Sequence, residues 1–227
     1  MATVLLLRHG RTTSNADGTL AGHQPVELDD VGRAQARAAG ARLANLPLAA
    51  VVTSPLVRCR QTLTEALPAV TPATDERLTE CGYGEWTGQQ LKTLARQPMW
   101  KVVQAHPSGA TFPGGEAMRE MQARAVDAVR DWDERVTQAH GAQAIWVAVS
   151  HGDVIKAVLA DALGMHLDNF QRIVVDPASV SAISYTPLRP FVVRFNEHGD
   201  LSALAPRGRP RRRKRADSDA AVGGGAG

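Results

Sequence analysis

Near its start the chain reads Val4-Leu5-Leu6-Leu7-Arg8-His9-Gly10, an apolar run that meets a guanidinium, an imidazole and a glycine without a spacer. Two further apolar runs of strand length occupy residues 49–53 and 145–150. Nearly continuous apolar runs of this length are typical of strands that are buried on both faces. The three runs therefore predict the centre of a parallel sheet, with polar residues at the carboxyl ends of its strands.

Helical patterns alternate with these runs. We predict a helix over about residues 30–44, with Asp30 as its N-cap. A second helix should start just after Ser54-Pro55, with Pro55 at the first helical position. Two more are expected over about residues 116–139 and after Gly152. Residues 180–186 and 191–195 are rich in β-formers and predict an antiparallel strand pair towards one edge of the sheet. Alternating strands and helices predict a three-layer α/β/α sandwich with a mainly parallel central sheet.

The chain length of 227 residues fits one domain, which we place at residues 1–205. Within it, residues 85–115 have weak periodicity and several Pro and Gly, and we interpret them as an insertion or lid. Residues 206–227 are basic and then Ala/Gly-rich, which predicts a disordered tail.

Composition excludes several classes of protein. Hydrophobic residues make up 44% and charged residues 22%, as in ordinary globular proteins. No apolar run approaches the ~18 residues of a membrane span, and the N-terminus lacks the features of a secretory signal. Two cysteines cannot form a disulfide framework, so we expect a cytoplasmic protein.

The net charge of +3 is unevenly distributed. Residues 207–215 hold seven of the 26 basic side chains, and Asp217 and Asp219 are two of the 23 acidic ones, so residues 1–206 carry 19 basic and 21 acidic groups, a net charge of −2. Such a basic run suits weak electrostatic contact with nucleic acid or another anionic surface. A nucleic-acid-binding protein that acts through this tail is therefore the alternative from a different class, although aromatic residues, at 4%, are too few for a base-stacking platform.

Three strand-to-helix turns carry side chains that can take part in catalysis or binding. They lie at residues 7–15, 54–62 and 150–153, each directly after one of the apolar runs. Because the carboxyl ends of parallel strands meet at one edge of a sheet, these turns should bring two histidines and at least two arginines together. The segment 77–84, which contains Glu80, can add a carboxylate to the same place.

This set of side chains suits phosphoryl transfer without a cofactor. Guanidinium groups bind phosphate oxygens in a planar, bidentate way, and a helix that begins after Gly152 adds backbone N–H donors. A neutral imidazole is a competent nucleophile near neutral pH, and an enclosed glutamic acid can protonate a leaving alcohol. We expect no metal, since His106, His140, His166 and His198 show no ligand spacing.

Four motifs in order carry a family resemblance. The segments Arg8-His9-Gly10…Asn15, Ser54-Pro55…Arg58…Gln61-Thr62, Glu80 and Ser150-His151-Gly152 resemble the histidine phosphatase superfamily, the phosphoglycerate-mutase-like family. The match covers roughly residues 3–186. It implies a metal-independent phosphomonoester hydrolase that acts on a small phosphorylated metabolite.

The resemblance also implies a role for each matching residue. His9 would become phosphohistidine; Arg8, Arg58 and His151 would hold the phosphoryl oxygens; Asn15 and Gly152 would help to form the phosphate pocket; and Glu80 would be the proton donor and then the base that activates water. Residues 112–116 resemble the family's Gly-Glu element and would border the substrate.

Two sequence features bear on the branch of the family. Residues 80–88 match the Glu-x-x-x-Gly-x-Trp-x-Gly pattern of cofactor-independent phosphatases, which favours a phosphatase over the alternative, a phosphoglycerate mutase.

Many relatives carry a Gln-Gly pair before the first long helix, whereas this chain has Ala21-Gly22 and then His23 and Gln24. The rim of the site should therefore differ from that of better-known relatives, with His23 or Gln24 as substitutes.

Several residues keep plainer alternatives. Asn15 is also a suitable turn or cap residue, and Arg11 and Arg60 suit a charged rim. Cys59 and Cys81 lie beside predicted site residues, and we expect them to be buried as small hydrophobic side chains rather than to form a redox switch. The edge strands near 180–195 allow a homodimer.

Overall fold

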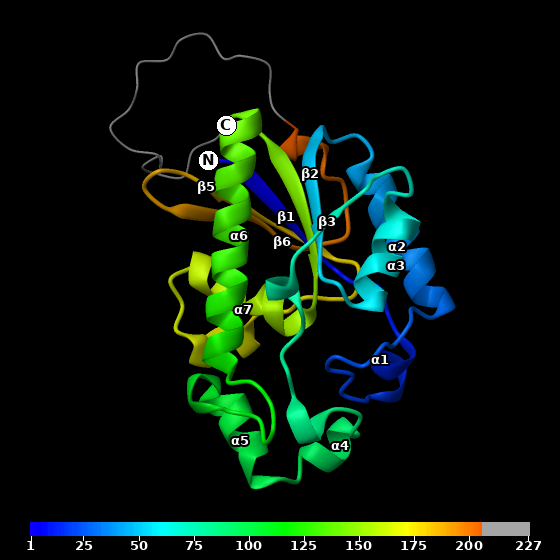
Figure 1. The fold of residues 1–227 in the computed structure, drawn as a ribbon, viewed down its shortest axis with the longest axis vertical. Helices are drawn as coiled ribbons and strands as arrows, with labels where there is room; N and C mark the ends of the chain where they lie inside the picture. The colour runs from blue at the N-terminus through cyan, green and yellow to red at the C-terminus, as the bar shows by residue number, and fades with distance from the viewer. Residues whose placement is uncertain (206–227) are drawn as a thin grey trace.

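The computed structural model describes residues 1–205, which form one six-stranded sheet with helices on both faces (Figure 1). The strands are β1 (Thr3–Arg8), β2 (Leu48–Thr53), β3 (Ala73–Thr74), β4 (Ile145–Ser150), β5 (Val180–Tyr185) and β6 (Pro190–Glu197). Their order is β3-β2-β4-β1-β5-β6. The first four are mutually parallel, whereas β5 and β6 are antiparallel additions at one edge. The predicted three-layer sandwich and its antiparallel edge pair are confirmed.

The helices between the strands follow the predicted alternation. They are α1 (Thr13–Asp17), α2 (Asp30–Leu43), α3 (Val57–Ala66), α4 (Leu91–Leu94), α5 (Pro98–Ala105), α6 (Met118–His140) and α7 (Gly152–Ala162), with short 3₁₀ helices η1 (Glu76–Leu78), η2 (Gly84–Trp86), η3 (Pro107–Gly109), η4 (Leu167–Arg172) and η5 (Ser202–Leu204). Among residues 1–205, no helix has the length and apolar character needed to cross a bilayer. The tail predicted to be disordered, residues 206–227, lies outside the described residues.

Two predicted helix starts were wrong by one or two residues. Asp29, not Asp30, caps α2, because Asp29 has the extended backbone and its carboxylate accepts the Gly32 N–H at 2.7 Å. Helix α3 starts at Val57, so Pro55 precedes it. The reason is that residues 54–56 form a bend before the helix, in which the Ser54 hydroxyl accepts the Leu56 N–H and also bonds the His151 ring.

Strand β1 divides the core into two halves because its side chains alternate between the faces of the sheet. Val4 and Leu6 belong to the apolar cluster under α6 and α7, whereas Leu5 and Leu7 belong to the cluster under α2 and α3. Both clusters therefore anchor the strand that leads to Arg8 and His9.

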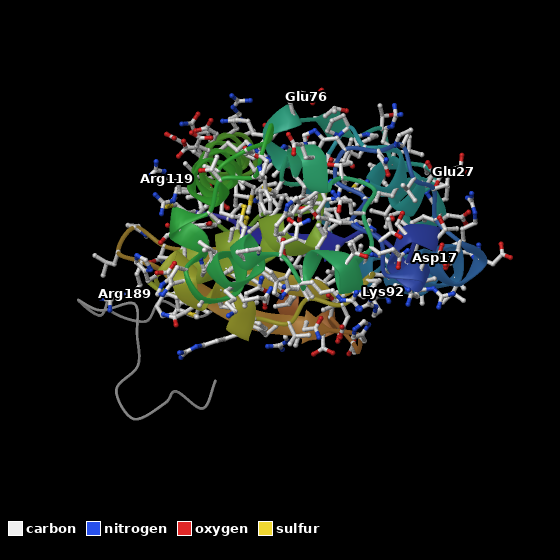
Figure 2. The ribbon with its side chains drawn as sticks, turned by 90° about the horizontal axis from the view of Figure 1, so that it is seen from below. Asp17, Glu27, Glu76, Lys92, Arg119 and Arg189 are labelled. Carbon is white, nitrogen blue, oxygen red and sulfur yellow. The ribbon has the colours of Figure 1, made fainter. Side chains whose placement is uncertain are left out.

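The short elements gather at one end of the molecule. In Figure 1, α1, α4 and α5 lie at the end opposite to the N-terminus, where β1 leads. Figure 2 views this end directly, with the exposed side chains of Glu27, Glu76 and Arg119 pointing outward around the periphery. The segment 85–115, predicted to be an insertion or lid, supplies α4, α5 and η3 here.

Helices α2 and α3 approach each other closely at Gly40. A Cβ atom at this position would lie 2.1 Å from the Ala66 carbonyl oxygen, which is backbone and cannot rotate away. We therefore expect Gly40→Ala to lower the free energy of unfolding by about 1–3 kcal/mol, as overpacked sites do. Urea denaturation followed by circular dichroism measures this change. The matched control is Gly109→Ala, where a Cβ meets nothing within 4 Å; equal stabilities of the two variants would contradict the prediction.

Candidate active site

The carboxyl ends of β1, β2 and β4 meet as the sequence predicts. Arg8 of β1 pairs with Ser150 of β4, and the His9 N–H donates to the Ser150 carbonyl oxygen at 3.0 Å. The Ser54 N–H donates to the Val149 carbonyl oxygen at 2.9 Å. The three turns therefore leave the sheet side by side, at the end of the molecule where α1, α4 and α5 lie.

The imidazole of His9 is buried and held in one tautomer. Its Nδ1 lies 2.7 Å from the carbonyl oxygen of Gly10, so Nδ1 carries the proton and donates it. The lone pair of the neutral ring is then on Nε2. Burial, followed by the charges of Arg58 and Arg8, lowers the pKa of His9 well below its ordinary value. His9 is therefore neutral and nucleophilic near pH 7.

A close backbone contact holds the carbonyl that orients His9. Gly10 lies against the first turn of α2, where a Cβ on Gly10 would be 2.4 Å from the Gly32 carbonyl oxygen. The Gly10 N–H donates to the Thr62 hydroxyl at 2.9 Å, and this hydroxyl donates to the Arg58 carbonyl at 2.7 Å. Thr62 belongs to a motif that the sequence already indicated, but its contact with Gly10 and the role of Gly32 were not predicted, because nothing local to either residue indicates a contact with Gly10.

Arg58 is almost fully buried and fixed by three neighbours. Its Nε donates to His151 Nδ1 at 3.2 Å, and its Nη2 and Nη1 donate to the carbonyl oxygens of Gly22 and Gln24 at 2.8 and 3.3 Å. Of the two predicted substitutes, Gln24 contributes only a main-chain oxygen that holds Arg58, and neither Gln24 nor His23 is among the described residues that line the cavity.

His151 uses both ring nitrogens within the protein. Burial, then the charges of Arg58 and other neighbours, lowers its pKa well below the ordinary value, so the ring is neutral. Because Nδ1 accepts from Arg58, Nε2 carries the proton and donates to the Ser54 hydroxyl at 2.8 Å. The His151 and His9 rings lie 5.3 Å apart between centroids. In this arrangement His151 orients Arg58 directly beside His9.

Arg8 offers an unused donor. Its Nη1 donates to the Val175 carbonyl oxygen at 2.6 Å, whereas its buried Nε has no hydrogen-bond partner among the described residues. The first residue of α7, Gly152, lies against the guanidinium, and a Cβ there would contact Arg8 Cζ at 3.4 Å. A buried donor that lacks a partner, next to a helix N-terminus, is suited to an anion.

The carboxyl group of Glu80 faces the same cavity and is 8% exposed. Burial, and then the negative charge of Asp153, raises its pKa to about 7, against the opposing charges of Arg58 and Arg8. One oxygen, Oε1, accepts the Cys81 N–H at 3.0 Å. A carboxyl group with this pKa exchanges a proton readily near neutral pH.

Arg124 of α6 holds the backbone on which Glu80 sits. Its guanidinium donates to the carbonyl oxygens of Arg77 and Thr79, each at 2.7 Å, and of Glu80 at 3.1 Å. His23 Nε2 also bonds the Glu80 carbonyl, at 2.6 Å. The role of Arg124 could not be predicted from the sequence, because an arginine on a polar helix face has the same local pattern as a solvated one.

The 112–116 element touches the cavity at one residue only. Phe112 lines it, whereas Glu116 pairs with Arg124 at 2.6 Å and accepts the Gly82 N–H at 3.1 Å. Of the element 112–116 that we expected to border the substrate, only Phe112 therefore lines the cavity. The salt bridge with Arg124 of α6, eight residues later in the sequence, holds Glu116 on the far side of the loop that carries Glu80.

Asn15 lines the cavity, but its side-chain oxygen is engaged. Oδ1 accepts from both the N–H and the hydroxyl of Thr12, at 3.1 and 3.0 Å, in a capping box at the start of α1. Asn15 therefore serves the capping box as its third helical residue, with Thr12 as the N-cap, and its amide NH₂ remains the group that can face a ligand.

Cys59 and Cys81 are free thiols, and both are fully buried. Burial raises the pKa of Cys59 to about 12 and that of Cys81 further. Thiols with such pKa values are unreactive near pH 7, so the interpretation as small core residues is confirmed.

These groups share one cavity of about 510 Å³. At its inner end lie two guanidiniums, the start of α7, the neutral His9 and the titratable Glu80: Arg8, Arg58, Gly152, His9, Glu80. An anion can bind the cationic groups there, with the imidazole as nucleophile and the carboxyl as proton donor. His151 stands directly behind this group and does not line the cavity. Residues 1–205 contain no cluster of three or more side chains that could hold a metal ion.

Comparison with known proteins places the chain among enzymes of phosphate esters. Residues 4–198 match the model of the histidine phosphatase superfamily (branch 1). The chain is 29% identical to a 2,3-bisphosphoglycerate-dependent phosphoglycerate mutase 2 of Gloeobacter violaceus, over 91% of this chain and 92% of that protein. It is 30% identical to a glucosyl-3-phosphoglycerate phosphatase of Mycolicibacterium vanbaalenii, over 74% and 76%. A solved mycobacterial glucosyl-3-phosphoglycerate phosphatase superposes with a TM-score of 0.76 at 25% identity, over 86% of this chain and 98% of that one.

The electrostatics of Glu80 generate a direct test. Because the charge of Asp153 helps to raise the pKa of Glu80 to about 7, Asp153→Asn should lower this pKa towards the ordinary glutamate range while keeping an acceptor for the Tyr83 hydroxyl. Carboxyl ¹³C NMR titration measures it. Asp161→Asn, which removes a carboxylate paired with Arg130, is the matched control and should leave the value unchanged. An identical titration of Glu80 in wild type and Asp153→Asn would show that Asp153 does not act on it.

Proposed function

The chain belongs to the histidine phosphatase superfamily, and we propose that it hydrolyses small phosphomonoesters through a phosphohistidine at His9. One observation carries the proposal: a neutral His9, with its lone pair on Nε2, shares a cavity with Glu80, whose pKa is about 7. Nucleophile and acid thus both have the protonation state that the reaction needs at the same pH.

The first step forms a bond from His9 Nε2 to phosphorus and breaks the bond from phosphorus to the ester oxygen. The proton of Glu80 goes to the departing alkoxide, which leaves as an alcohol. The phosphorylated ring keeps its Nδ1–H and becomes cationic, and the Gly10 carbonyl oxygen at 2.7 Å stabilises that charge. In the second step, Glu80 takes a proton from water as the oxygen attacks phosphorus, which releases phosphate and restores both residues.

The phosphoryl oxygens bind to donors that are already in place. Arg8 supplies its unpartnered Nε, Arg58 its guanidinium edge, and α7 the N–H groups of its first turn, which begins at Gly152. Asn15 offers its amide NH₂ from α1. His151 takes part by orienting Arg58; for direct contact with the phosphoryl group, one of its ring nitrogens must exchange its present partner.

The second candidate function is a phosphoglycerate mutase, favoured by the likeness to the Gloeobacter violaceus enzyme over most of both chains. A mutase must retain a bisphosphorylated intermediate, which requires cations at two places. Away from Arg8 and Arg58, the described residues that line the cavity include one cation, Lys156, and it lies 3.5 Å from the carboxylate of Asp153. This distribution of charge supports the phosphatase.

The domain boundary and the location of the protein are further parts of this proposal. The family match ends at residue 198, which supports a catalytic domain within residues 1–205. Two buried free thiols support a reducing compartment such as the cytoplasm.

Phosphate release from aryl, sugar, nucleotide and glycerate phosphates, in the presence of EDTA, tests the activity. We expect His9→Ala to lower turnover at least ~10³-fold, because it removes the nucleophile. Arg58→Lys should cost about 10²-fold, since an ammonium cannot reproduce the planar fork. The matched control is Arg60→Lys, an exposed arginine on the same helix, which should stay within about twofold of wild type.

The same assay separates the two candidate functions. No phosphate release from any ester, together with interconversion of 2- and 3-phosphoglycerate after priming with the bisphosphate, would replace the phosphatase by the mutase. If neither phosphate release nor interconversion of the phosphoglycerates is detected, phosphoryl transfer is rejected as the function.

The role of Glu80 predicts a mildly acidic pH optimum. As pH rises through about 7, the Glu80 carboxyl loses the proton that it must donate, so kcat/KM falls. On the acid side, the low pKa of His9 keeps the nucleophile neutral well below pH 6.5. Glu80→Gln should remove the alkaline fall and lower kcat/KM for an alkyl phosphate about 10²-fold or more. For p-nitrophenyl phosphate the loss should be much smaller, because its leaving group needs no proton.

The exposed Glu85, five residues further on, supplies the control variant Glu85→Gln. It should keep the wild-type pH profile with both esters. Equal losses for alkyl and aryl esters in Glu80→Gln would show that Glu80 is not the proton donor.

A further inference from the structure

The outer part of the cavity is lined by apolar side chains that remain exposed to solvent. Leu91 of α4 is 38% exposed, and Val174, in the segment after η4, is 58% exposed. Both line the cavity, and they come from segments more than 80 residues apart. Exposed apolar side chains that gather on a concave surface mark a binding site for an apolar group.

Aromatic rings form the wall behind these side chains. Trp86 and Trp100 stack with centroids 6.2 Å apart and an interplanar angle of 22°. Phe112 packs edge-on against Trp86, at 5.3 Å between centroids. All three line the cavity, and this mutual contact holds them as a rigid wall.

The charge of this outer region does not favour an anion. Apart from Arg8, Arg58 and Glu80 at the inner end, the cavity lining within residues 1–205 holds the cation Lys156 and the carboxylates Asp153 and Asp176. Lys156 is already engaged, at 3.5 Å from Asp153 Oδ1 and 3.1 Å from the Gln171 side-chain oxygen. A second anionic group on the substrate would meet no unpaired cation there and would lie near two carboxylates.

We propose that the alcohol half of the substrate is uncharged and carries an aromatic ring or another flat apolar group, bound in the outer cavity. We call this part of the cavity the leaving-group pocket and define it by Trp86, Leu91, Trp100, Phe112 and Val174. The inference rests on the proposed phosphatase function and narrows its substrate class: phosphomonoesters of ring-bearing, uncharged alcohols, in preference to phosphorylated carboxylic acids.

Three alkyl esters test the substrate class without a change in leaving-group chemistry: propyl phosphate, 3-phenylpropyl phosphate and 3-carboxypropyl phosphate. Their alcohols are similarly basic, so differences in kcat/KM report binding of the distal group. We expect the phenyl ester to exceed the propyl ester at least about tenfold, the low end for burial of a ring. The carboxyl ester should not exceed the propyl ester. A carboxyl ester that is the best of the three would overturn the proposal.

Variants in the pocket make the test specific. Leu91→Ala/Val174→Ala should reduce the phenyl-to-propyl ratio of kcat/KM severalfold. The matched control is Val31→Ala/Val70→Ala, whose side chains are 45% and 38% exposed outside the cavity, and which should keep the wild-type ratio. Val174→Arg should raise kcat/KM for the carboxyl ester by up to about fivefold, the value of an exposed ion pair. An unchanged ratio in the pocket variant would overturn the assignment of these residues.

Binding of phosphonates separates this inference from the proposed function, because their carbon–phosphorus bond is not hydrolysed by this chemistry. By calorimetry, 3-phenylpropylphosphonate should bind wild type at least about tenfold more tightly than propylphosphonate. If that preference appears and no ester is hydrolysed, the proposed function fails and the pocket stands. Equal affinities, with esters hydrolysed normally, would reject the pocket and leave the phosphatase in place.

Discussion

The 2.7 Å hydrogen bond from His9 Nδ1 to the Gly10 carbonyl oxygen is the contact on which the rest of the site depends. It selects the tautomer that places a lone pair on Nε2, and it offers a negative dipole to the ring once that nitrogen is phosphorylated. The close packing of the start of α2 against the turn after β1, which holds this carbonyl, requires that Gly10 and Gly32 lack side chains. Residues in two different elements thus determine which nitrogen of His9 can react.

Burial then sets the protonation states around this bond. His9 and His151 lie within a group of arginines and away from water, so both are held neutral. The same burial acts in the opposite direction on Glu80 and raises its pKa to about 7. The ordinary pKa of histidine lies about two above that of glutamic acid. In this site the order is reversed, so that a neutral His9 and a protonated Glu80 coexist.

The acid depends on contacts that are remote in the sequence. Glu80 sits on a loop without regular hydrogen bonding, and Arg124, more than 40 residues later, fixes the loop by bonding three of its carbonyl oxygens. Glu116 completes this support by pairing with Arg124 while it accepts the Gly82 N–H. The ion pair between Arg124 of the long helix α6 and Glu116, which precedes that helix, consequently positions a group in the cavity.

The sequence alone determined the layered sheet and the residues at its carboxyl edge, because apolar runs report burial and strand ends report position. The strand ends predicted that His9, Arg58 and His151 come together, whereas the assignment of a role to each residue, Glu80 included, came from the resemblance to the histidine phosphatase superfamily, since each lies in a local motif. Tertiary structure decided which residues support them: Gly32, Thr62 and Arg124 make their decisive contacts with residues at least 20 positions away. It also decided the apolar character of the outer cavity, because Leu91, Trp100 and Val174 come together only when the 85–115 segment folds over the strand ends. Local patterns encode burial and capping, whereas a contact between distant segments depends on how the whole chain packs.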